Sequence, residues 1–177
     1  MTKLPSEKEC IRILKDAGCD SDVVKHCKAV SDMAVLIAEK IEGANIKLVR
    51  VGGLLHDLGR AETHGIAHAI KGAKLAEKLN LPEDVIGIIR NHIGAGLTLE
   101  ESFELGLPDG DYMPETLEQK IVAHADNMID YFKPVPISNI ITKLSARGQS
   151  RAVERITKLH EELSKLAGVN LDKLVEK

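Results

Sequence analysis

A histidine–aspartate pair, His56-Asp57, places the strongest constraint on how this chain can fold, because it ends an apolar run that begins near Ile46. The run carries apolar side chains around most of a helical turn: Val49, Val51, Leu54, Leu55 and Leu58. It therefore predicts a short helix that is buried on most sides. An ionised carboxylate buried alone costs on the order of several kcal/mol, so Asp57 requires a cation or several hydrogen-bond donors. A metal ion meets that requirement, and the adjacent imidazole favours one.

Capping and breaking signals divide the rest of the chain into further helical segments. Capping boxes begin at Ser6 and Thr98, and Asn45 can cap the helix that carries the pair. Helices are predicted over about 6–17, 21–43, 46–58, 82–91, 98–106, 116–131, 138–146 and 149–167, and one more opens at Thr63 or Gly65 and runs to about Leu79. Residues 107–114 predict a loop, and no segment shows the alternation of a strand. The predicted fold class is all-α, a helical bundle with short connections.

Length and composition are those of one folded domain. The chain has 177 residues, of which 44% are hydrophobic and 29% charged, so it can bury one substantial core. Its three cysteines lack the spacing of a metal or disulfide motif, and we expect reduced thiols. No apolar run approaches the length of a membrane span, and the first residues lack the hydrophobic region of a signal peptide. We therefore expect a cytoplasmic protein with no membrane partner.

Charge and aromatic content argue against nonspecific binding of a nucleic-acid polymer. The formal net charge is -3 at pH 7, so the chain offers no polycation to a phosphate backbone. Two Phe, two Tyr and no Trp leave few rings on which bases can stack. No nucleic-acid polymer is therefore expected among its partners.

Four more polar residues stand on otherwise apolar helix faces, where an unpaired polar group is costly. They are His26, His68, His92 and Asp126. Taken alone, each histidine has an ordinary alternative, which is a hydrogen-bonded residue of the core. The joint pattern with His56-Asp57 favours a metal site, because imidazoles and carboxylates suit divalent ions such as Mn²⁺, Fe²⁺, Co²⁺, Ni²⁺ or Zn²⁺.

The order of these residues resembles the HD superfamily of metal-dependent phosphohydrolases, all-helical proteins that are named for the His-Asp dipeptide. The resemblance covers about residues 21–132. It implies that one metal ion is bound by His26, His56, Asp57 and Asp126. Within the single domain expected over 1–177, the resemblance marks an HD core over about 21–132. The N-terminal helix in 1–20 and the C-terminal helical extension over 138–177 lie outside it.

Two further segments resemble the binuclear, HDIG-type branches of the superfamily. His68-Ala-Ile-Lys-Gly-Ala is similar to their His-x-x-x-Gly-Ala segment, and His92 resembles their fifth ligand. The resemblance therefore implies a cofactor of two divalent transition-metal ions, with Mg²⁺ as a further option, and Asp57 as the carboxylate that bridges them. Two ions about 3.5–4 Å apart can activate a water and polarise a phosphoryl oxygen for in-line displacement at phosphorus.

Substrate phosphates need cationic or amide partners beside the metal ligands. Arg60 stands where many members of the superfamily have a lysine, and we predict that it serves catalysis by binding phosphate; the alternative is a solvated surface arginine. Amides of the turn that begins at Gly94 can add donors, because small residues allow close approach. His64 is four residues from His68 and is a predicted substrate contact. It can instead support a ligand, hold a third metal or lie in solvent where the helix starts.

Three other polar side chains have weaker claims to a role. Glu62 is a candidate proton-transfer group only because it is close to Arg60 in sequence. His124 precedes Asp126 by two residues, so on a helix it points about 200° away and can at most support a ligand. His160 lies on the apolar stripe of the last helix, which predicts a position in the core or at an interface. That helix can close the bundle or form a homodimer.

The leading hypothesis for function is a phosphohydrolase that cleaves a phosphate ester or anhydride of a nucleotide with a hydroxide activated by metal. The segment from Ala125 to Pro134 is similar to the bacterial diadenosine-tetraphosphate hydrolases, so a dinucleoside polyphosphate is one candidate substrate. Nucleotidase, phosphodiesterase and pyrophosphohydrolase activities are not distinguished, but the Gly-Tyr-Pro signature of the cyclic-dinucleotide branch is absent after His92. The alternatives are a non-catalytic nucleotide or metal sensor of the same fold, and a helical interaction protein whose histidines are structural.

Overall fold

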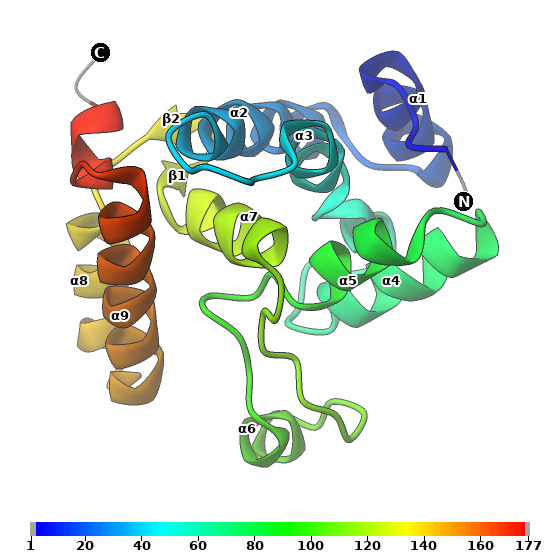
Figure 1. Cartoon of the computed structure of the whole chain (residues 1–177). Coiled ribbons are helices and arrows are strands. Elements are labelled where there is room, and N and C mark those ends of the chain that lie inside the picture. The colour runs from blue at the N-terminus through cyan, green and yellow to red at the C-terminus, as the bar shows by residue number, and fades with distance from the viewer. Residues whose placement is uncertain (1–2, 176–177) are drawn as a thin grey trace.

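In the computed structural model, which describes residues 3–175, helices pack around a buried α2–α3–α7 centre (Figure 1). The α-helices are α1 Glu7–Ala17, α2 Ser21–Ala38, α3 Ile46–Leu55, α4 His68–Lys78, α5 Glu83–Arg90, α6 Leu99–Glu104, α7 Leu117–Asn127, α8 Ser138–Ala146 and α9 Ser150–Ala167. The short elements are the 3₁₀ turns η1 Leu58–Ala61 and η2 Leu171–Leu174 and the strands β1 Ile129–Asp130 and β2 Lys133–Pro134. The predicted all-α fold class is confirmed.

The predicted caps account for where several helices begin. Ser6 and Glu9 form the capping box of α1, and Thr98 and Glu101 form that of α6. The Asn45 side chain accepts from the Leu48 amide at 3.1 Å and so caps α3. These local signals are readable from sequence because both partners lie within one turn.

Several predicted boundaries differ from the structure, among them the end of α3, which was predicted near residue 58 and lies at Leu55. Asp20, not Ser21, caps α2, and that helix ends at Ala38 rather than Gly43. The helix predicted from Thr63 or Gly65 begins only at His68. It starts late because the Thr63 hydroxyl accepts from the Gly65 amide at 3.2 Å, and the Arg60 guanidinium donates to the His64 carbonyl at 2.6 Å. Both contacts hold this segment in a turn.

A small antiparallel pair of strands also departs from the prediction, which placed helix as far as Tyr131. Helix α7 ends at Asn127, and β1 then pairs with β2 in the register Ile129–Pro134 and Asp130–Lys133. Tyr131 and Phe132 form the two-residue turn between these strands. The proline at 134 cannot donate a ladder hydrogen bond, so the pairing stays short.

Helix α3 lies at the centre of the fold and is buried from Leu48 onwards apart from the half-buried Arg50. It crosses α2 closely at Gly53, where a Cβ atom would lie 2.6 Å from the Ser31 Cα. This crossing brings the end of α3, and therefore the His56-Asp57 pair, against the α2 side of the bundle. A glycine is required there because two helix backbones touch.

Of the C-terminal helices, α9 packs beside α7 and α8 packs against α9, and both lie away from α1 (Figure 1). Ile156 and Leu163 of α9 are fully buried, whereas α8 has no buried residue. Helix α6 projects from the body on two long connections, and Leu99, Phe103 and Leu105 are exposed on and beside it. The tail therefore forms a side wall of the bundle.

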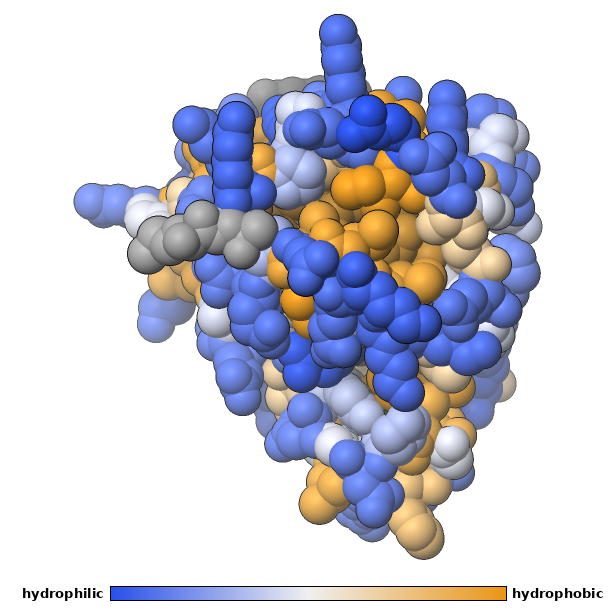
Figure 2. Space-filling model, turned by 90° about the vertical axis from the view of Figure 1, so that its right-hand side faces the viewer, coloured by the Kyte–Doolittle hydropathy of each residue, from blue (hydrophilic) through white to orange (hydrophobic). Residues whose placement is uncertain are grey.

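The face shown in Figure 2 is mostly hydrophilic, with one apolar hollow in its upper half and further hydrophobic residues at its lower end, over the α6 region. Within residues 3–175, no helix combines the length and apolar character that crossing a membrane requires.

Candidate metal centre

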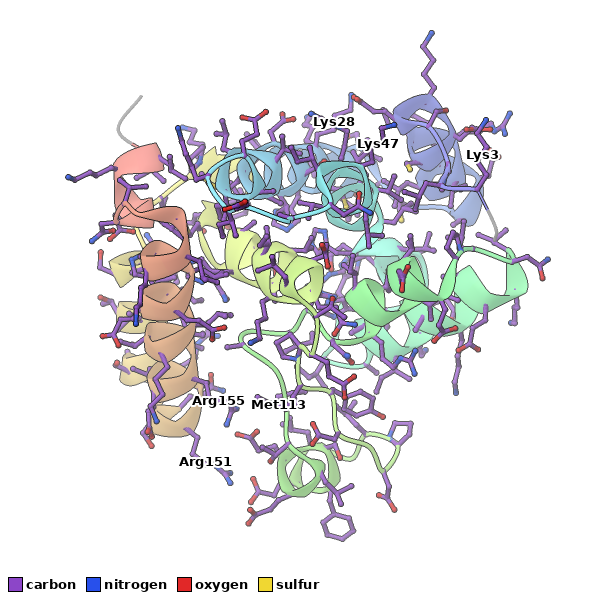
Figure 3. The ribbon with its side chains drawn as sticks, viewed as in Figure 1. Lys3, Lys28, Lys47, Met113, Arg151 and Arg155 are labelled. Carbon is purple, nitrogen blue, oxygen red and sulfur yellow. The ribbon has the colours of Figure 1, made fainter. Side chains whose placement is uncertain are left out.

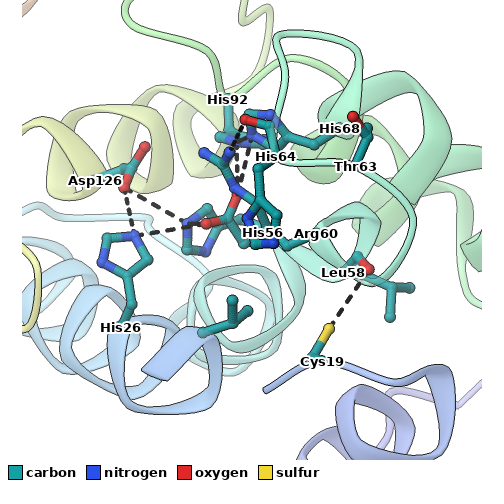
Figure 4. Close-up of polar contacts among 12 residues, drawn as sticks. Cys19, His26, His56, Leu58, Arg60, Thr63, His64, His68, His92 and Asp126 are labelled. Atoms are coloured by element: carbon teal, nitrogen blue, oxygen red, sulfur yellow. Dashed lines mark hydrogen bonds and ion pairs between the residues drawn. The ribbon is translucent and has the colours of Figure 1, made fainter. Parts of the chain in front are cut away.

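The six predicted ligands lie together in the fold, although they come from five different parts of the chain (Figure 4). His26 is on α2, the His56-Asp57 pair joins α3 to η1, and His68 begins α4. His92 follows the C-terminal end of α5, and Asp126 lies in the last turn of α7. His56, Asp57, His68 and His92 are buried, whereas His26 and Asp126 are partly open to solvent.

All four imidazoles are oriented in the same way. Each Nδ1 atom contacts a main-chain carbonyl oxygen: His26 that of Tyr131 at 2.5 Å, His56 that of Gly53 at 2.8 Å, His68 that of Gly65 at 2.8 Å and His92 that of Ile89 at 2.7 Å. A carbonyl oxygen can only accept, so each Nδ1 carries a proton and donates it. In the neutral ring the Nε2 atom is then the unprotonated nitrogen, and it faces the cluster, which is the tautomer that metal binding requires.

The two carboxylate oxygens of Asp57 face different imidazoles. Its Oδ1 lies 3.0 Å from His68 Nε2 and 3.5 Å from His92 Nε2. Its Oδ2 lies 3.8 Å from His26 Nε2 and 3.7 Å from His56 Nε2. The two oxygens of Asp57 thus define two groups of imidazoles that share this carboxylate, and His92 also lies within reach of His56 and Asp126.

The group around Oδ2 is completed by Asp126. Its Oδ1 lies 2.9 Å from His26 Nε2 and 3.6 Å from His56 Nε2. The His56 Nε2 atom is buried and has no hydrogen-bond partner within the described part of the chain. An unsatisfied buried lone pair that faces two carboxylates fits a bound cation.

The carboxylates of the cluster are held in their ionised form. Burial raises the pKa of Asp57, but the imidazoles of His56, His68 and His92 outweigh it and hold that pKa well below its usual value. Burial also raises the pKa of Asp126, and contacts with His26 and His56 lower it further than burial raises it. Two negative charges in a mostly buried site need positive charge close by, so the donor set fits divalent ions.

Arg60 lies beside the ligands and is only partly exposed. Its Nε donates to Asp57 Oδ1 at 3.2 Å, and its Nη1 donates to the His64 carbonyl. The His64 imidazole is itself exposed and does not line the cavity next to the cluster. Of the two, only the Arg60 side chain therefore faces the space in front of the ligands.

A cavity of about 640 Å³ opens from the cluster towards the C-terminal helices. Its lining includes Arg60, His68, His92, Gly94 and Asp126 near the ligands, and Arg147, Arg151 and Arg155 from the α8–α9 region. Arg151 and Arg155 point from α9 towards α6 (Figure 3). Arg155 donates to both carboxylate oxygens of Glu101 at 2.8 Å and to the Gly96 carbonyl at 3.2 Å. No site role was predicted for the arginines from the sequence, although Arg151 and Arg155 are four residues apart on α9 and therefore lie on one face of that helix.

The turn after His92 is held from two sides. Asn127, the neighbour of Asp126, donates to the Gly94 carbonyl at 2.8 Å, and Arg155 reaches Gly96 from α9. Gly94 and Gly96 have positive φ angles of 58° and 100°. The turn therefore links the position of His92 to both α7 and α9.

The remaining polar candidates lie apart from the ligands. Glu62 is exposed and pairs with Lys71 at 3.8 Å. His124 Nε2 lies 3.0 Å from His160 Nδ1 in the contact between α7 and α9. Burial lowers the pKa of His124 to about 3, with a further contribution from His160. His160 is buried, as predicted for a core residue, and this pair joins the C-terminal helix to the bundle.

Comparisons with known proteins agree with this architecture. The family model described as HD domain matches residues 23–129. An uncharacterized protein of Methanocaldococcus jannaschii is 46% identical over 165 residues, which are 90% of this chain and 97% of that protein. The HD domain of the L. monocytogenes phosphodiesterase PgpH has a TM-score of 0.54 at 21% identity, covering 90% of this chain and 95% of that one, and so shares the fold.

Two further relatives carry names that refer to RNA. A tRNA (cytidine(56)-2'-O)-methyltransferase of Picrophilus torridus is 40% identical over 173 residues, or 98% of this chain and 50% of that protein. The chain thus spans about half the length of the methyltransferases that it matches. Ribonuclease Y of Finegoldia magna is 36% identical over 107 residues, or 59% of this chain and 18% of that protein.

Proposed function

The chain belongs to the HD-domain family, and we propose from this premise that it is a metal-dependent phosphohydrolase acting on a phosphate ester or anhydride of a nucleotide. The observation that carries the proposal is the common orientation of four imidazoles. Their Nδ1 protons are all used by main-chain carbonyls, and their Nε2 lone pairs converge on two ionised carboxylates. A purely structural cluster would instead pair these lone pairs with donors.

The ligand atoms suggest two metal positions. His26, His56 and Asp126 would hold one ion with Asp57 Oδ2, and His68 and His92 would hold the other with Asp57 Oδ1. Bound divalent ions would supply Lewis acidity towards a phosphoryl oxygen and lower the pKa of water at the site. The number of ions and their identity are part of this proposal.

The residues around the ligands would bind and orient the substrate. Arg60 keeps Asp57 in place through its Nε and lines the cavity, so its remaining N–H groups can bind a phosphate oxygen. The turn at Gly94 borders the same space, and its missing side chains leave room for a phosphate. The cavity beyond has a volume within the range typical of small-molecule sites, roughly 300–1,000 Å³. A nucleoside attached to the reacting phosphate would occupy it.

RNA phosphodiesters are a second candidate class of substrate. Two relatives are named for enzymes that act on RNA, and one of them aligns with almost all of this chain. This candidate would replace the expectation from net charge that no nucleic-acid polymer is a partner. The non-catalytic sensor is the alternative that shares the metal site without turnover.

One preparation tests these hypotheses together. The protein is purified without added metal, its metal content per chain is measured, and phosphate or nucleotide release is assayed. The substrates would be a nucleoside monophosphate, a nucleoside diphosphate, diadenosine tetraphosphate and a short single-stranded RNA. The Asp57→Asn variant, purified identically, controls for contaminating phosphatases. Less than about 0.1 equivalent of metal, unrestored by Mn²⁺ or Fe²⁺, would contradict the metal site. Metal without turnover on any substrate would favour the sensor.

A further inference from the structure

Aromatic residues are rare in this chain, and most of them lie on its surface. The sequence has two Phe, two Tyr and no Trp. Tyr131 is 80% exposed, Phe132 is 45% exposed and Phe103 is 76% exposed. Tyr131 and Phe132 are adjacent and form the turn between β1 and β2. Two neighbouring exposed rings in a chain with so few aromatics indicate a use outside the core.

The backbone of this turn breaks a local rule. Tyr131 has a φ of 57°, and the only other non-glycine residue with positive φ within residues 3–175 is Asn80. Two-residue hairpin turns favour Asn and Gly at such positions, because a side chain such as that of Tyr is strained there by about 1–2 kcal/mol. Strain of this kind persists where the surroundings enforce it, and it concentrates at functional sites.

The contact that holds the backbone of Tyr131 in this conformation comes from one of the candidate metal ligands. The Tyr131 carbonyl accepts from His26 Nδ1, while His26 Nε2 on the opposite edge of the ring faces Asp126. The aromatic turn is thus only one imidazole ring away from the metal-binding cluster. The β1–β2 pairing and the Val135–Met128 main-chain hydrogen bond of 2.8 Å fix the turn on the end of α7.

The charges around the two rings favour a phosphorylated ligand. Lys25 Nζ lies 5.8 Å from the centre of the Phe132 ring, and Lys133 is exposed with no ion pair among the described residues. Lys143 and Lys25 each pair with an acid near the turn, Asp130 at 2.8 Å and Asp22 at 3.1 Å, so Lys133 is the cation left for a phosphate. Two rings, each contributing at most about 250 Å², offer less than the roughly 800 Å² per partner of a standard protein interface. A planar base next to a phosphate fits this patch better than a folded protein.

We propose that the Tyr131–Phe132 turn is a stacking site for a nucleobase of the substrate, beside the metal centre and separate from the α9-lined cavity. The inference rests on the proposed function for its choice of ligand. If both sites are filled at once, the reacting phosphate has a nucleoside on each side. The substrate is then a phosphodiester or a dinucleotide rather than a mononucleotide.

The absence of tryptophan allows a direct binding test. The Tyr131→Trp variant places a single indole in the turn, and Phe103→Trp places one on α6 as the matched control. Both proteins, loaded with Mn²⁺, are titrated with adenosine 5′-monophosphate, ribose 5-phosphate and a hexa-adenylate RNA. We expect adenosine 5′-monophosphate and the RNA to quench the indole fluorescence of Tyr131→Trp in a saturable way. Ribose 5-phosphate should leave it unchanged, and the Phe103→Trp control should respond to none of the three.

A second measurement separates stacking from a structural role. Tyr131→Ala should weaken nucleotide binding about tenfold, whereas Tyr131→Phe should retain it. Metal content should stay equal in both variants, because the main-chain carbonyl that holds His26 remains. Quenching of the Tyr131→Trp protein that is equal for ribose 5-phosphate, or absent for both adenine ligands, would overturn the stacking site. Quenching in a protein that hydrolyses no phosphate would support the stacking site and contradict only the proposed activity. Tighter binding of the RNA than of the mononucleotide would support the stacking site and indicate that the stacked base belongs to an RNA.

Discussion

The Nε2 atoms of His68 and His92 lie 3.0 Å apart, although each ring already donates its Nδ1 proton to a main-chain carbonyl. Two lone pairs at this separation repel each other unless a proton or a metal ion lies beside them. Asp57 Oδ1 is 3.0 Å from the first nitrogen and 3.5 Å from the second. Helices α4 and α5 thus bring two imidazoles to the carboxylate oxygen of Asp57, at a point where a cation is favoured.

Substitution of Asp57 and substitution of His92 should remove different numbers of metal ions. We expect about two metal equivalents in the wild-type protein, close to none in Asp57→Ala and about one in His92→Ala, because only Asp57 faces both groups of ligands. Elemental analysis after dialysis would measure this, alongside a folding check by circular dichroism. Equal losses from the two variants would contradict the binuclear arrangement.

Metal occupancy should decrease as the pH falls. Burial lowers the pKa of His26, but the contact with Asp126 outweighs burial, so the pKa of His26 is raised. Burial also lowers the pKa of His56, but the negative charge of Asp57 outweighs burial and holds the pKa of His56 well above its usual value. A raised pKa leaves more of the imidazole protonated at a given pH, and protons compete with metal for the ring nitrogen. We therefore expect affinity for Mn²⁺ to fall as the pH drops from about 8 to below about 6. Titration calorimetry at several pH values would measure it, and affinity that is constant down to about pH 4 would exclude histidine ligation.

Arg60 should act through its fork of donors and not through charge alone. Arg60→Lys keeps the charge but cannot contact Asp57, the His64 carbonyl and a phosphate together, so we expect kcat/KM to fall by roughly tenfold or more. Arg90→Lys is a matched control, because among the described residues Arg90 forms its ion pair with the exposed Glu83, at 2.9 Å. Steady-state kinetics with equal metal loading would decide, and identical values for both variants would assign Arg60 no role with substrate.

Gly59 should tolerate no side chain. A Cβ atom at this position would overlap the His68 carbonyl and lie 2.5 Å from the Gly72 amide nitrogen. Gly59→Ala must therefore push η1 away from α4, and we expect a loss of about 2–4 kcal/mol in the free energy of unfolding together with weaker metal binding. Gly65→Ala is the control, because its Cβ would meet nothing closer than the Thr63 hydroxyl at 3.5 Å. Urea denaturation of both variants would test this, and an unchanged midpoint for Gly59→Ala would refute the close contact.

Much of the candidate site was predictable because its signals are local. An acid and a histidine at the end of an apolar helix need partners wherever that helix lies, so the position of Asp57 in the sequence already indicated a cation. The order of the other ligands resembled a family whose membership is now shown by the match over residues 23–129. Their assignment to particular ions stays a prediction.

The boundaries that failed depend on individual side-chain and strand contacts, which the helical periodicity of the sequence does not report. Helix α4 begins late because Arg60 and Thr63 hold the preceding turn, and α7 ends early because Asn127 and the β1–β2 pair redirect the chain. The arginines of α9 line the cavity only because the C-terminal tail packs beside α7, and the sequence does not predict that packing. No periodicity in the sequence reports which face of a helix meets which neighbour.

The sequence by itself determined the helical class, several of the caps and the set of candidate metal ligands, because propensity, capping and ligand chemistry act within a few residues. Only the tertiary structure decided how those residues share the site. It set the imidazole tautomers through four main-chain carbonyls, divided the oxygens of Asp57 between two groups of histidines, and joined the strained Tyr131 turn to His26. These relationships depend on distances between helices, which packing of the whole core fixes.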